Sequence, residues 1–291
     1  MNEDNIKRIL ITGGKGQLGR ALQRALTGNE LIIADLPELD ITDRPGINTL
    51  LAAARPGLVI HCAAYTDVDG CARDPQLAHR VNALGTQNVA LACRQTGAAM
   101  LHISTNEVFA GDNPAGYAEY APLNPINPYG HSKALAEHHV RSLVPRHYIV
   151  RLAWLFAPGG RNFIHTILRL ARQNGQLRVV ADEIGNPTYS EDLAQALSQL
   201  IQTGQYGTYH LTNSGACSRW AFANEILRQA GLDHVPNTPI LSRDFPRPST
   251  PPPYGTLHNN SAAALGITLR PWPAALADFL RHDAQDTKQG S

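Results

Sequence analysis

A tyrosine and a lysine four residues apart are suited to proton transfer. Tyr129 and Lys133 lie in the segment NPYGHSK, where Asn127 can cap a helix and Pro128 suits its first position. One helical turn then places both side chains on one face. A free tyrosine has a pKa of about 10, and a nearby ammonium favours the phenolate, so we expect Lys133 to lower the pKa of Tyr129. A lone YxxxK pattern is common, and its alternative is a polar helix surface.

A row of polar residues follows an apolar run upstream of this pair. The segment HISTNEVF places Thr105, Asn106 and Glu107 side by side. Strand ends in parallel sheets open onto a ligand crevice. We therefore expect Glu107 to face a substrate pocket and to accept a hydrogen bond from a substrate hydroxyl. A purely structural role and an acid–base role are the alternatives.

A glycine-rich turn near the N-terminus has the pattern of a dinucleotide-binding loop. In ITGGKGQLGR, Gly13, Gly16 and Gly19 recur every third residue, and Gly14, Gly16 and Gly19 also fit GxGxxG. Glycine permits the tight turn, the approach of the backbone to a pyrophosphate and close packing of the next helix. The turn follows an apolar run and opens a helical stretch, and Asp35 ends the next apolar run. This context predicts a dinucleotide site rather than a plain structural turn.

Charged residues around this turn bear on the choice of dinucleotide. Asp35 could bind the adenosine ribose hydroxyls and repel a 2′-phosphate, which favours NADH, or it could only cap a strand end. Asp40, in ELDITD, could lie near the adenine. Lys15 and Arg20 are close enough in sequence to meet a 2′-phosphate. The sequence predicts NADPH or NADH as the cofactor and leaves the preference open.

Apolar runs alternate with helical stretches through the first half of the chain. The apolar runs, typical of strands, are residues 8–12, 31–35, 58–64, 100–104 and 148–154. Helical periodicity between them covers residues 17–28, 47–55, 75–97 and 128–143. Strands buried on both faces are continuously apolar, as these are. The predicted fold class is α/β, a Rossmann-type doubly wound parallel sheet with helices on both faces.

After Trp154 the alternation of apolar runs and helical stretches becomes less regular. The elements expected there are helices at about 161–173, 190–202, 218–231 and 272–283, and strands near 178–180 and at 208–212. The proline-rich segment DFPRPSTPPPYG is typical of a stiff loop over a site. We therefore predict a dinucleotide-binding domain at 1–155, completed by about 188–214, and a smaller C-terminal α/β substrate-binding lobe made of 156–187 and 215–291.

Composition narrows the classes of protein. The chain has 291 residues, 43% hydrophobic and 17% charged, which is ordinary globular content. Lysine and arginine number 25 against 24 acids without a dense basic run, so we expect no nucleic-acid partner. The start MNEDNIKRIL lacks the apolar core of a signal peptide, and no stretch is apolar enough for a membrane span. We expect a cytoplasmic protein, either a monomer or a homodimer.

The cysteines and acids show no pattern of metal ligands. Cys62, Cys71, Cys93 and Cys217 have neither CxxC nor metal-ligand spacing, and no cluster of acids requires a metal. In a chain of this length such cysteines are most simply reduced and buried. We therefore expect no metal site and no disulfide framework.

Taken in their order, the motifs resemble those of the extended short-chain dehydrogenase/reductase family, in particular its branch of dTDP-4-dehydrorhamnose reductases. The similar segments are GGKGQLG, RPGLVIHCAAYTDVDGCARDP, HISTNEVFAG, PLNPINPYGHSKALAE, RLAWLFAPGGRNF, GNPTYSEDLA and LRPWPAALADFL. They span about residues 7 to 283. Each motif alone is loose, and their joint order is specific.

The resemblance implies a role for each matching residue. Thr105 and Tyr129 would polarise and protonate the C4 ketone of a sugar nucleotide, and Lys133 would hold the nicotinamide ribose. Trp154 would face the sugar nucleotide, although a core aromatic is an equal alternative. The expected cofactor contacts are Gly13, Gly14, Gly16, Gln17, Leu18, Gly19, Asp35, Asp40, Ile41, Ala63, Ala64, Tyr65, Asn82, Tyr129 and Lys133. The expected substrate contacts are Thr66, Val68, Thr105, Asn106, Glu107, Trp154, Arg161, Asn162 and Arg247.

Two departures from the family pattern concern the substrate. The reductases usually read STDYVF where this chain reads STNEVF, and the related 4,6-dehydratases read STDEVY. An amide cannot donate a proton as a carboxylic acid does, so Asn106 argues against dehydratase chemistry. The family also usually has an Arg-Pro for the phosphates where this chain has Pro252 and Pro253. Arg247 or Arg161 could bind the phosphates instead.

The resemblance implies reduction of dTDP-4-dehydro-L-rhamnose to dTDP-L-rhamnose, with Tyr129 as the proton donor. One alternative is another extended-family epimerase or dehydratase, which would recycle its hydride. A second is a non-catalytic regulatory subunit of the same fold, as the β subunit of methionine adenosyltransferase is. The presence of Thr105, Tyr129 and Lys133 together weighs against that subunit.

Overall fold

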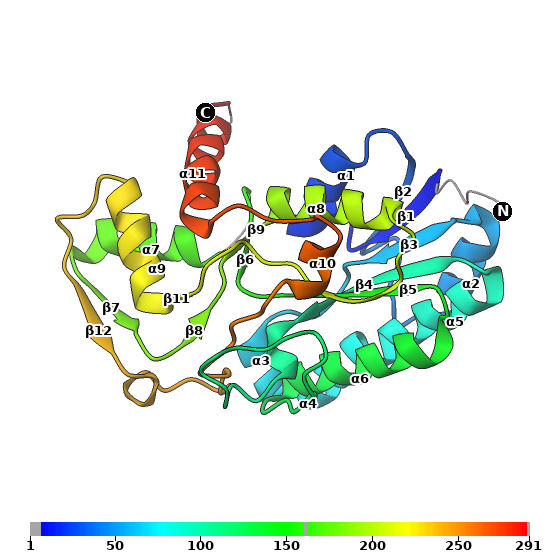
Figure 1. The fold of residues 1–291 in the computed structure, drawn as a ribbon, viewed down its shortest axis with the longest axis horizontal. Coiled ribbons are helices and arrows are strands. Elements are labelled where there is room, and N and C mark those ends of the chain that lie inside the picture. The colour runs from blue at the N-terminus through cyan, green and yellow to red at the C-terminus, as the bar shows by residue number, and fades with distance from the viewer. Residues whose placement is uncertain (1–6, 160–161, 290–291) are drawn as a thin grey trace.

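The centre of the protein is a six-stranded parallel sheet (Figure 1). The computed structural model describes residues 7–159 and 162–289, with side chains described up to residue 283. The strands, in spatial order, are β2 (Glu30–Ala34), β1 (Arg8–Thr12), β3 (Leu58–His61), β4 (Ala99–Thr105), β5 (His147–Leu152) and β10 (Gly207–His210). The predicted fold class is confirmed. The strand order reverses between β1 and β3, which is where such sheets bind ligands.

Helices cover both faces of the sheet (Figure 1). One face carries α1 (Gln17–Ala25) and α8 (Ser190–Gln202), which pack against each other. The other face carries α2 (Arg44–Ala54), α5 (Thr86–Thr96) and α6 (Pro128–Leu143). Every residue of β3 is buried, which explains why the central strands are continuously apolar in sequence.

The segment predicted as one helix over residues 75–97 is not a regular helix. It comprises α4 (Pro75–Ala78), a π-helix (His79–Gly85) and α5. A short helix, α3 (Val68–Arg73), precedes it, where no element was predicted. A π-helical turn shifts the register of side chains around the axis, and such turns recur at functional sites. Periodicity alone missed this break because a π-helix differs from an α-helix in its i→i+5 hydrogen bonds and not in its residue types.

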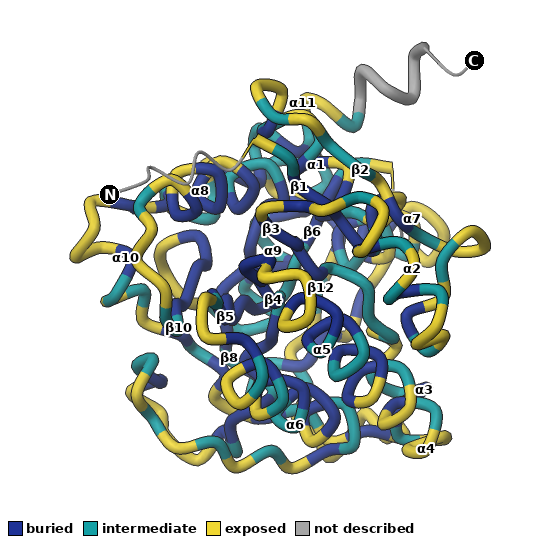
Figure 2. Tube along the Cα trace, turned by 90° about the vertical axis from the view of Figure 1, so that its right-hand side faces the viewer, coloured by how far each residue is buried: buried dark blue, intermediate teal, exposed yellow. Residues whose placement is uncertain are grey.

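Most of the remaining elements form a smaller cluster beyond α8. They are β6 (Leu155–Phe156), α7 (Phe163–Asn174), β7 (Leu177–Val180), β8 (Ile184–Gly185), β9 (Thr188–Tyr189), β11 (Cys217–Ser218), α9 (Arg219–Gln229), β12 (Asn237–Ile240) and α11 (Trp272–Gln289). The exception is α10 (Asn260–Ala264). Phe156, Ile164, Phe222 and Phe279 are the centre of a second core, separate from the cores of the sheet. In Figure 2 the strands β3, β4 and β5 are mostly dark blue, the colour of buried residues. The division into two lobes at the predicted boundaries stays a prediction, and α10 packs against β10 of the sheet.

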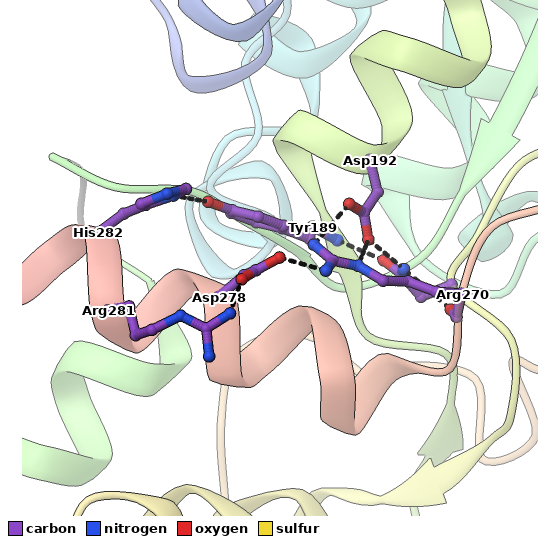
Figure 3. A network of polar contacts seen from close by, with 7 residues as sticks. Tyr189, Asp192, Arg270, Asp278, Arg281 and His282 are labelled. Atoms are coloured by element: carbon purple, nitrogen blue, oxygen red, sulfur yellow. Dashed lines mark hydrogen bonds and ion pairs between the residues drawn. The ribbon is translucent and has the colours of Figure 1, made fainter.

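A polar network joins α11 to the start of α8 (Figure 3). Arg270 donates to both carboxylate oxygens of Asp192, each at 2.8 Å, and it also pairs with Asp278. The Tyr189 hydroxyl lies 3.0 Å from Nδ1 of His282. These contacts hold the C-terminal helix on the segment that leads into α8. In the described part of the chain, no helix has the length and apolar character needed to cross a bilayer.

A buried ion pair fastens α6 to the sheet. Glu137 on α6 accepts hydrogen bonds of 2.8 Å and 2.8 Å from Arg151 on β5 and one of 2.6 Å from Ser104 on β4. Both charged side chains are almost completely buried. Burial alone would raise the pKa of Glu137, but the bonds from Arg151 and Ser104 hold it below its usual range. The pair therefore fixes the helix that carries Tyr129 and Lys133.

Candidate active site

A cavity of about 790 Å³ opens at the carboxyl ends of the sheet strands. It extends from the glycine turn after β1 to Thr105 at the end of β4 and to Trp154 beyond β5. The predicted residues that line it are Gly13, Gly16, Gln17, Leu18, Gly19, Asp35, Asp40, Ile41, Ala63, Ala64, Tyr65, Thr66, Val68, Thr105, Asn106, Glu107, Tyr129, Lys133 and Trp154. Cofactor and substrate candidates therefore share one continuous space.

The glycine turn fits a dinucleotide because side chains there would fill the cradle. Gly13 has φ +68°, and a Cβ on it would lie 2.6 Å from the backbone nitrogen of Ala63. A Cβ on Gly19 would lie 2.4 Å from the carbonyl oxygen of Gly13. Gly16 caps α1, whose first turn lines the cavity, and the N-terminus of a helix favours an anion. Gly14 instead packs against Ile33.

Asp35 lines the cavity at the end of this cradle that is predicted to hold the ribose. Its carboxylate accepts the backbone N–H of Lys15 at 2.7 Å and that of Leu36 at 2.8 Å. The Lys15 side chain turns away to Glu38, at 2.6 Å, rather than toward the cavity. Asp40 accepts two hydrogen bonds of 2.8 Å from Thr42. The role of Asp35 at the ribose stays a prediction, and Lys15 is already paired with Glu38.

Tyr129 and Thr105 meet at the end of β4. As predicted, Asn127 caps α6, accepting the N–H of Gly130 at 2.8 Å, and Pro128 begins the helix. Burial raises the pKa of Tyr129, the charge of Glu107 raises it further, and a hydrogen bond with Thr105 opposes both. The expected lowering by Lys133 is wrong for this arrangement, because the lysine ammonium is directed elsewhere. Tyr129 is therefore held as a neutral phenol.

Lys133 is bound to β4 rather than to Tyr129. Its ammonium donates to the carbonyl of Ile103 at 2.6 Å and lies 3.2 Å from Nε2 of His102. Burial lowers the pKa of Lys133 to about 8, against the charge of Glu137. Burial likewise lowers the pKa of His102 well below its usual value, so this imidazole is neutral and accepts at Nε2.

Glu107 lies on the cavity wall and is hydrogen-bonded to Asn127, the N-cap of α6. One carboxylate oxygen accepts from Nδ2 of Asn127 at 2.7 Å. Burial raises the pKa of Glu107, and the Asn127 bond and the charges of Arg219 and Arg247 oppose this. Asn106 is buried beside it, 3.3 Å from the Thr105 hydroxyl. The carboxylate is thus placed to meet a substrate hydroxyl, and that role stays a prediction.

Asn82, on the π-helix, connects the loop after β3 to α6. Its amide accepts the N–H of Tyr65 at 2.7 Å and donates to the Tyr65 carbonyl at 3.0 Å. It also donates to the hydroxyl of Ser132 at 3.0 Å, and Ser132 donates to the carbonyl of Tyr129 at 2.7 Å. Asn82 is fully buried, so it acts behind the cavity wall rather than on it.

Two predicted substrate contacts, Asn162 and Arg247, do not line the described wall of the cavity. Asn162 caps α7 by accepting the N–H of His165 at 3.0 Å and donates to the carbonyl of Ala157 at 2.9 Å, so the structure gives it a local role. Arg247 is paired with Asp69 at 3.0 Å. Arg161 lies outside the described residues. The proline-rich loop that carries Arg247 does reach the site, because the carbonyl of Thr250 accepts from Asn127 at 3.1 Å.

Among the charged residues that line the described cavity, Arg219 was not predicted from the sequence. Arg219, the first residue of α9, lies with its guanidinium 3.7 Å from the ring centroid of Trp154. Pairing of β8 with β11 brings residue 219 next to the segment around Gly185, which the Trp154 ring also contacts. The sequence signal here was the helix predicted over 218–231, which says nothing of a site. In the structure Ser218 caps this helix by accepting the N–H of Ala221 at 3.0 Å.

The doubly wound sheet, the glycine cradle and the Thr105–Tyr129–Lys133 group define a dinucleotide-dependent enzyme of the extended short-chain dehydrogenase/reductase type. The model of the family described as RmlD substrate binding domain matches residues 7–285, and the chain belongs to this family. The resemblance inferred from the motifs is thereby confirmed.

Relatives match over nearly the whole chain. Identity is 39% over 278 residues to dTDP-4-dehydrorhamnose reductase of Mycolicibacterium smegmatis, covering 94% of this chain and 84% of that protein. It is 37% over 279 residues to the spore coat polysaccharide biosynthesis protein SpsK of Bacillus subtilis, covering 94% and 97%. The crystal structure of dTDP-4-dehydrorhamnose reductase from Bacillus anthracis in complex with NADP is similar with a TM-score of 0.91 at 39% identity, covering 95% and 99%.

Proposed function

We propose that this protein reduces the C4 ketone of a 4-keto-6-deoxy sugar nucleotide with NADPH or NADH. The substrate that the family favours is dTDP-4-dehydro-L-rhamnose, which gives dTDP-L-rhamnose. The observation that carries the proposal is the meeting of Tyr129 and Thr105 in the same cavity as the glycine cradle. Relatives named as dTDP-4-dehydrorhamnose reductases, and the NADP complex of one of them, support it.

The residues supply what a ketone reduction needs besides the hydride. A bound reduced nicotinamide supplies that hydride. Tyr129, whose pKa is raised by burial, keeps its proton at neutral pH and can donate it to the developing alkoxide. Thr105 lines the same cavity and would orient the same oxygen. Lys133 and the cradle residues Gly13 and Asp35 hold the cofactor.

The organisation around the site follows from this function. We assign residues 1–155, completed by about 188–214, to cofactor binding, and 156–187 with 215–291 to the substrate lobe. A cytoplasmic location, and a monomer or homodimer as the active form, remain part of the proposal.

The test uses the purified protein with dTDP-4-dehydro-L-rhamnose and either NADPH or NADH, following oxidation of the cofactor. We expect one equivalent of cofactor to be consumed per substrate. Tyr129→Phe should lower kcat by about a hundredfold or more, because a general acid contributes about 10²–10⁴-fold. NADPH binding to Tyr129→Phe, measured by fluorescence, checks that the variant is folded.

Different outcomes identify the alternatives. Conversion of a sugar nucleotide without net cofactor oxidation would indicate an epimerase or dehydratase that recycles its hydride. Absence of turnover in both the wild type and Tyr129→Phe, with cofactor binding intact, would indicate a non-catalytic protein of this fold. Either result would overturn the reductase proposal.

A further inference from the structure

The guanidinium of Arg219 is built into the wall of the cavity. It lies over the Trp154 ring at 3.7 Å from the centroid, and it is 5.2 Å from the ring centroid of Phe163 on α7. Its backbone N–H donates to the carbonyl of Glu183 at 3.1 Å. Only a quarter (25%) of the side chain is exposed, and the exposed part lines the cavity. Stacking fixes the plane of the guanidinium and reduces the freedom of its long side chain.

This charge is poorly matched by protein groups. The Glu183 carboxylate is the described ion-pair partner, at 3.8 Å, which is too long for a hydrogen bond. Within 7–159 and 162–283, no side-chain or backbone acceptor makes a hydrogen bond with the guanidinium. Burial lowers the pKa of Arg219 to about 10, and Glu183 and Glu107 oppose this shift. A guanidinium has five N–H donors, and leaving them without acceptors in a desolvated site is costly.

Other basic groups near the cavity are already engaged. The basic residues of its described lining are Lys133 and Arg219. Lys133 donates to Ile103, and Arg247 is held by Asp69 at 3.0 Å. Among the basic residues that line the described cavity, Arg219 therefore has guanidinium N–H donors available for a ligand.

Arg219 shares the cavity with the reacting end. Tyr129, Glu107 and Arg219 all line it, and Arg219 stands on the part of the wall formed by Trp154. A substrate whose ketone meets Tyr129 can therefore reach Arg219 within the same cavity. In a sugar nucleotide, the group attached to the sugar is an anionic diphosphate.

We propose that Arg219, stacked on Trp154, binds the diphosphate of the sugar-nucleotide substrate. This inference rests on the proposed function. The planar guanidinium matches two phosphate oxygens at once, which a single ammonium cannot do. Glu183 orients the guanidinium without occupying its donors. Arg219 therefore takes the role that the sequence assigned to Arg247 or Arg161.

The experiment is calorimetric titration of the full-length protein, saturated with NADP⁺, with dTDP and with thymidine. Wild type should bind dTDP more tightly than thymidine. Arg219→Gln should reduce that preference by about tenfold to a hundredfold, the range for charge-assisted hydrogen bonds, and leave thymidine binding unchanged. Arg219→Lys should restore part of the preference. Arg243→Gln, an exposed residue of the 3₁₀ turn Ser242–Asp244, is the matched control and should match wild type.

The outcomes separate this inference from the proposed function, because dTDP binding needs no turnover. Equal loss of dTDP and thymidine binding in Arg219→Gln would show that the residue only shapes the pocket. An unchanged preference, or a wild type that does not prefer dTDP to thymidine, would also overturn the inference. If the protein shows no reductase activity but binds dTDP through Arg219, the diphosphate site stands and the reductase proposal fails.

Discussion

The ammonium of Lys133 lies 3.2 Å from Nε2 of His102, inside the core of the sheet. His102 pairs in register with His61 on β3, and the two rings stack at 5.5 Å. His61 is held separately, by Thr12 at 2.7 Å and Thr86 at 3.0 Å. One buried histidine therefore contacts the candidate catalytic lysine, and its stacked neighbour does not.

The first prediction concerns the pH dependence of the reaction. Burial lowers the pKa of Lys133 to about 8, so its charged form is lost as the pH rises through that value. We expect kcat/KM, which reports the free enzyme, to fall above about pH 8. Steady-state rates across pH 6 to about 10 measure this limb. A profile that stays flat to the pH where free lysine titrates would contradict the prediction.

The second prediction assigns His102 the positioning of Lys133. His102→Leu removes an acceptor that stabilises the ammonium, so the alkaline limb should move down by about one pH unit. His102→Gln keeps a polar atom at the same distance and should retain the wild-type limb. His61→Leu disturbs the same core without contacting Lys133. If His61→Leu shifted the alkaline limb of the pH profile as far as His102→Leu does, the shift would come from disturbed core packing and not from the contact with Lys133.

The third prediction tests Glu107 as a substrate contact. Glu107→Gln should raise KM for the sugar nucleotide by about tenfold, the loss of a charged hydrogen bond, with kcat changed less. The amide can still accept from Asn127, which keeps the helix cap in place. Substrate binding by calorimetry and steady-state kinetics together give the answer. A collapse of kcat with intact binding would make Glu107 an acid–base group.

The fourth prediction concerns the choice of cofactor. Asp35→Ala removes a carboxylate from the ribose end of the cradle and should raise the ratio of kcat/KM for NADPH over NADH by about tenfold. The comparison variant is Asp40→Ala. The wild-type Asp40 carboxylate is bonded to Thr42, so its removal should change the NADPH to NADH ratio of kcat/KM less. If Asp35→Ala had the same NADPH to NADH ratio of kcat/KM as wild type, Asp35 would not discriminate between the two cofactors.

The fifth prediction concerns stability. Arg151→Met leaves the buried carboxylate of Glu137 without its main partner and should lower the free energy of unfolding by about 3–5 kcal/mol. Arg141→Met removes the exposed partner of the same carboxylate and should cost less than about 1 kcal/mol. Urea denaturation of both variants is the measurement. Equal losses would show that burial of the pair does not set its strength.

The pH dependence of these variants follows from the direction of the pKa shift. The pKa of Glu137 is lowered in the folded protein, so its contribution is present at neutral pH and is lost as the pH falls below the usual range of glutamate. The stability gap between wild type and Arg151→Met should therefore narrow in acid.

Local signals in the sequence were sufficient for much of the fold. The Asn127 cap and Pro128 predicted where α6 begins, and the glycine turn predicted where β1 gives way to α1. The strand predicted to run through Trp154 was too long. β5 ends at Leu152 because Trp154 takes a left-handed backbone conformation with φ +46°, which no sequence pattern marks.

Residue types and spacing by themselves determined the sheet, the dinucleotide turn and the Thr105, Tyr129 and Lys133 candidates. These features depend on periodicity and on neighbours within a few residues. Only the tertiary structure decided that Lys133 binds His102, that Arg247 pairs with Asp69 and that Arg219 stacks on Trp154. Such contacts join segments far apart in the chain, and their partners are chosen by strand pairing and by the packing of the whole core.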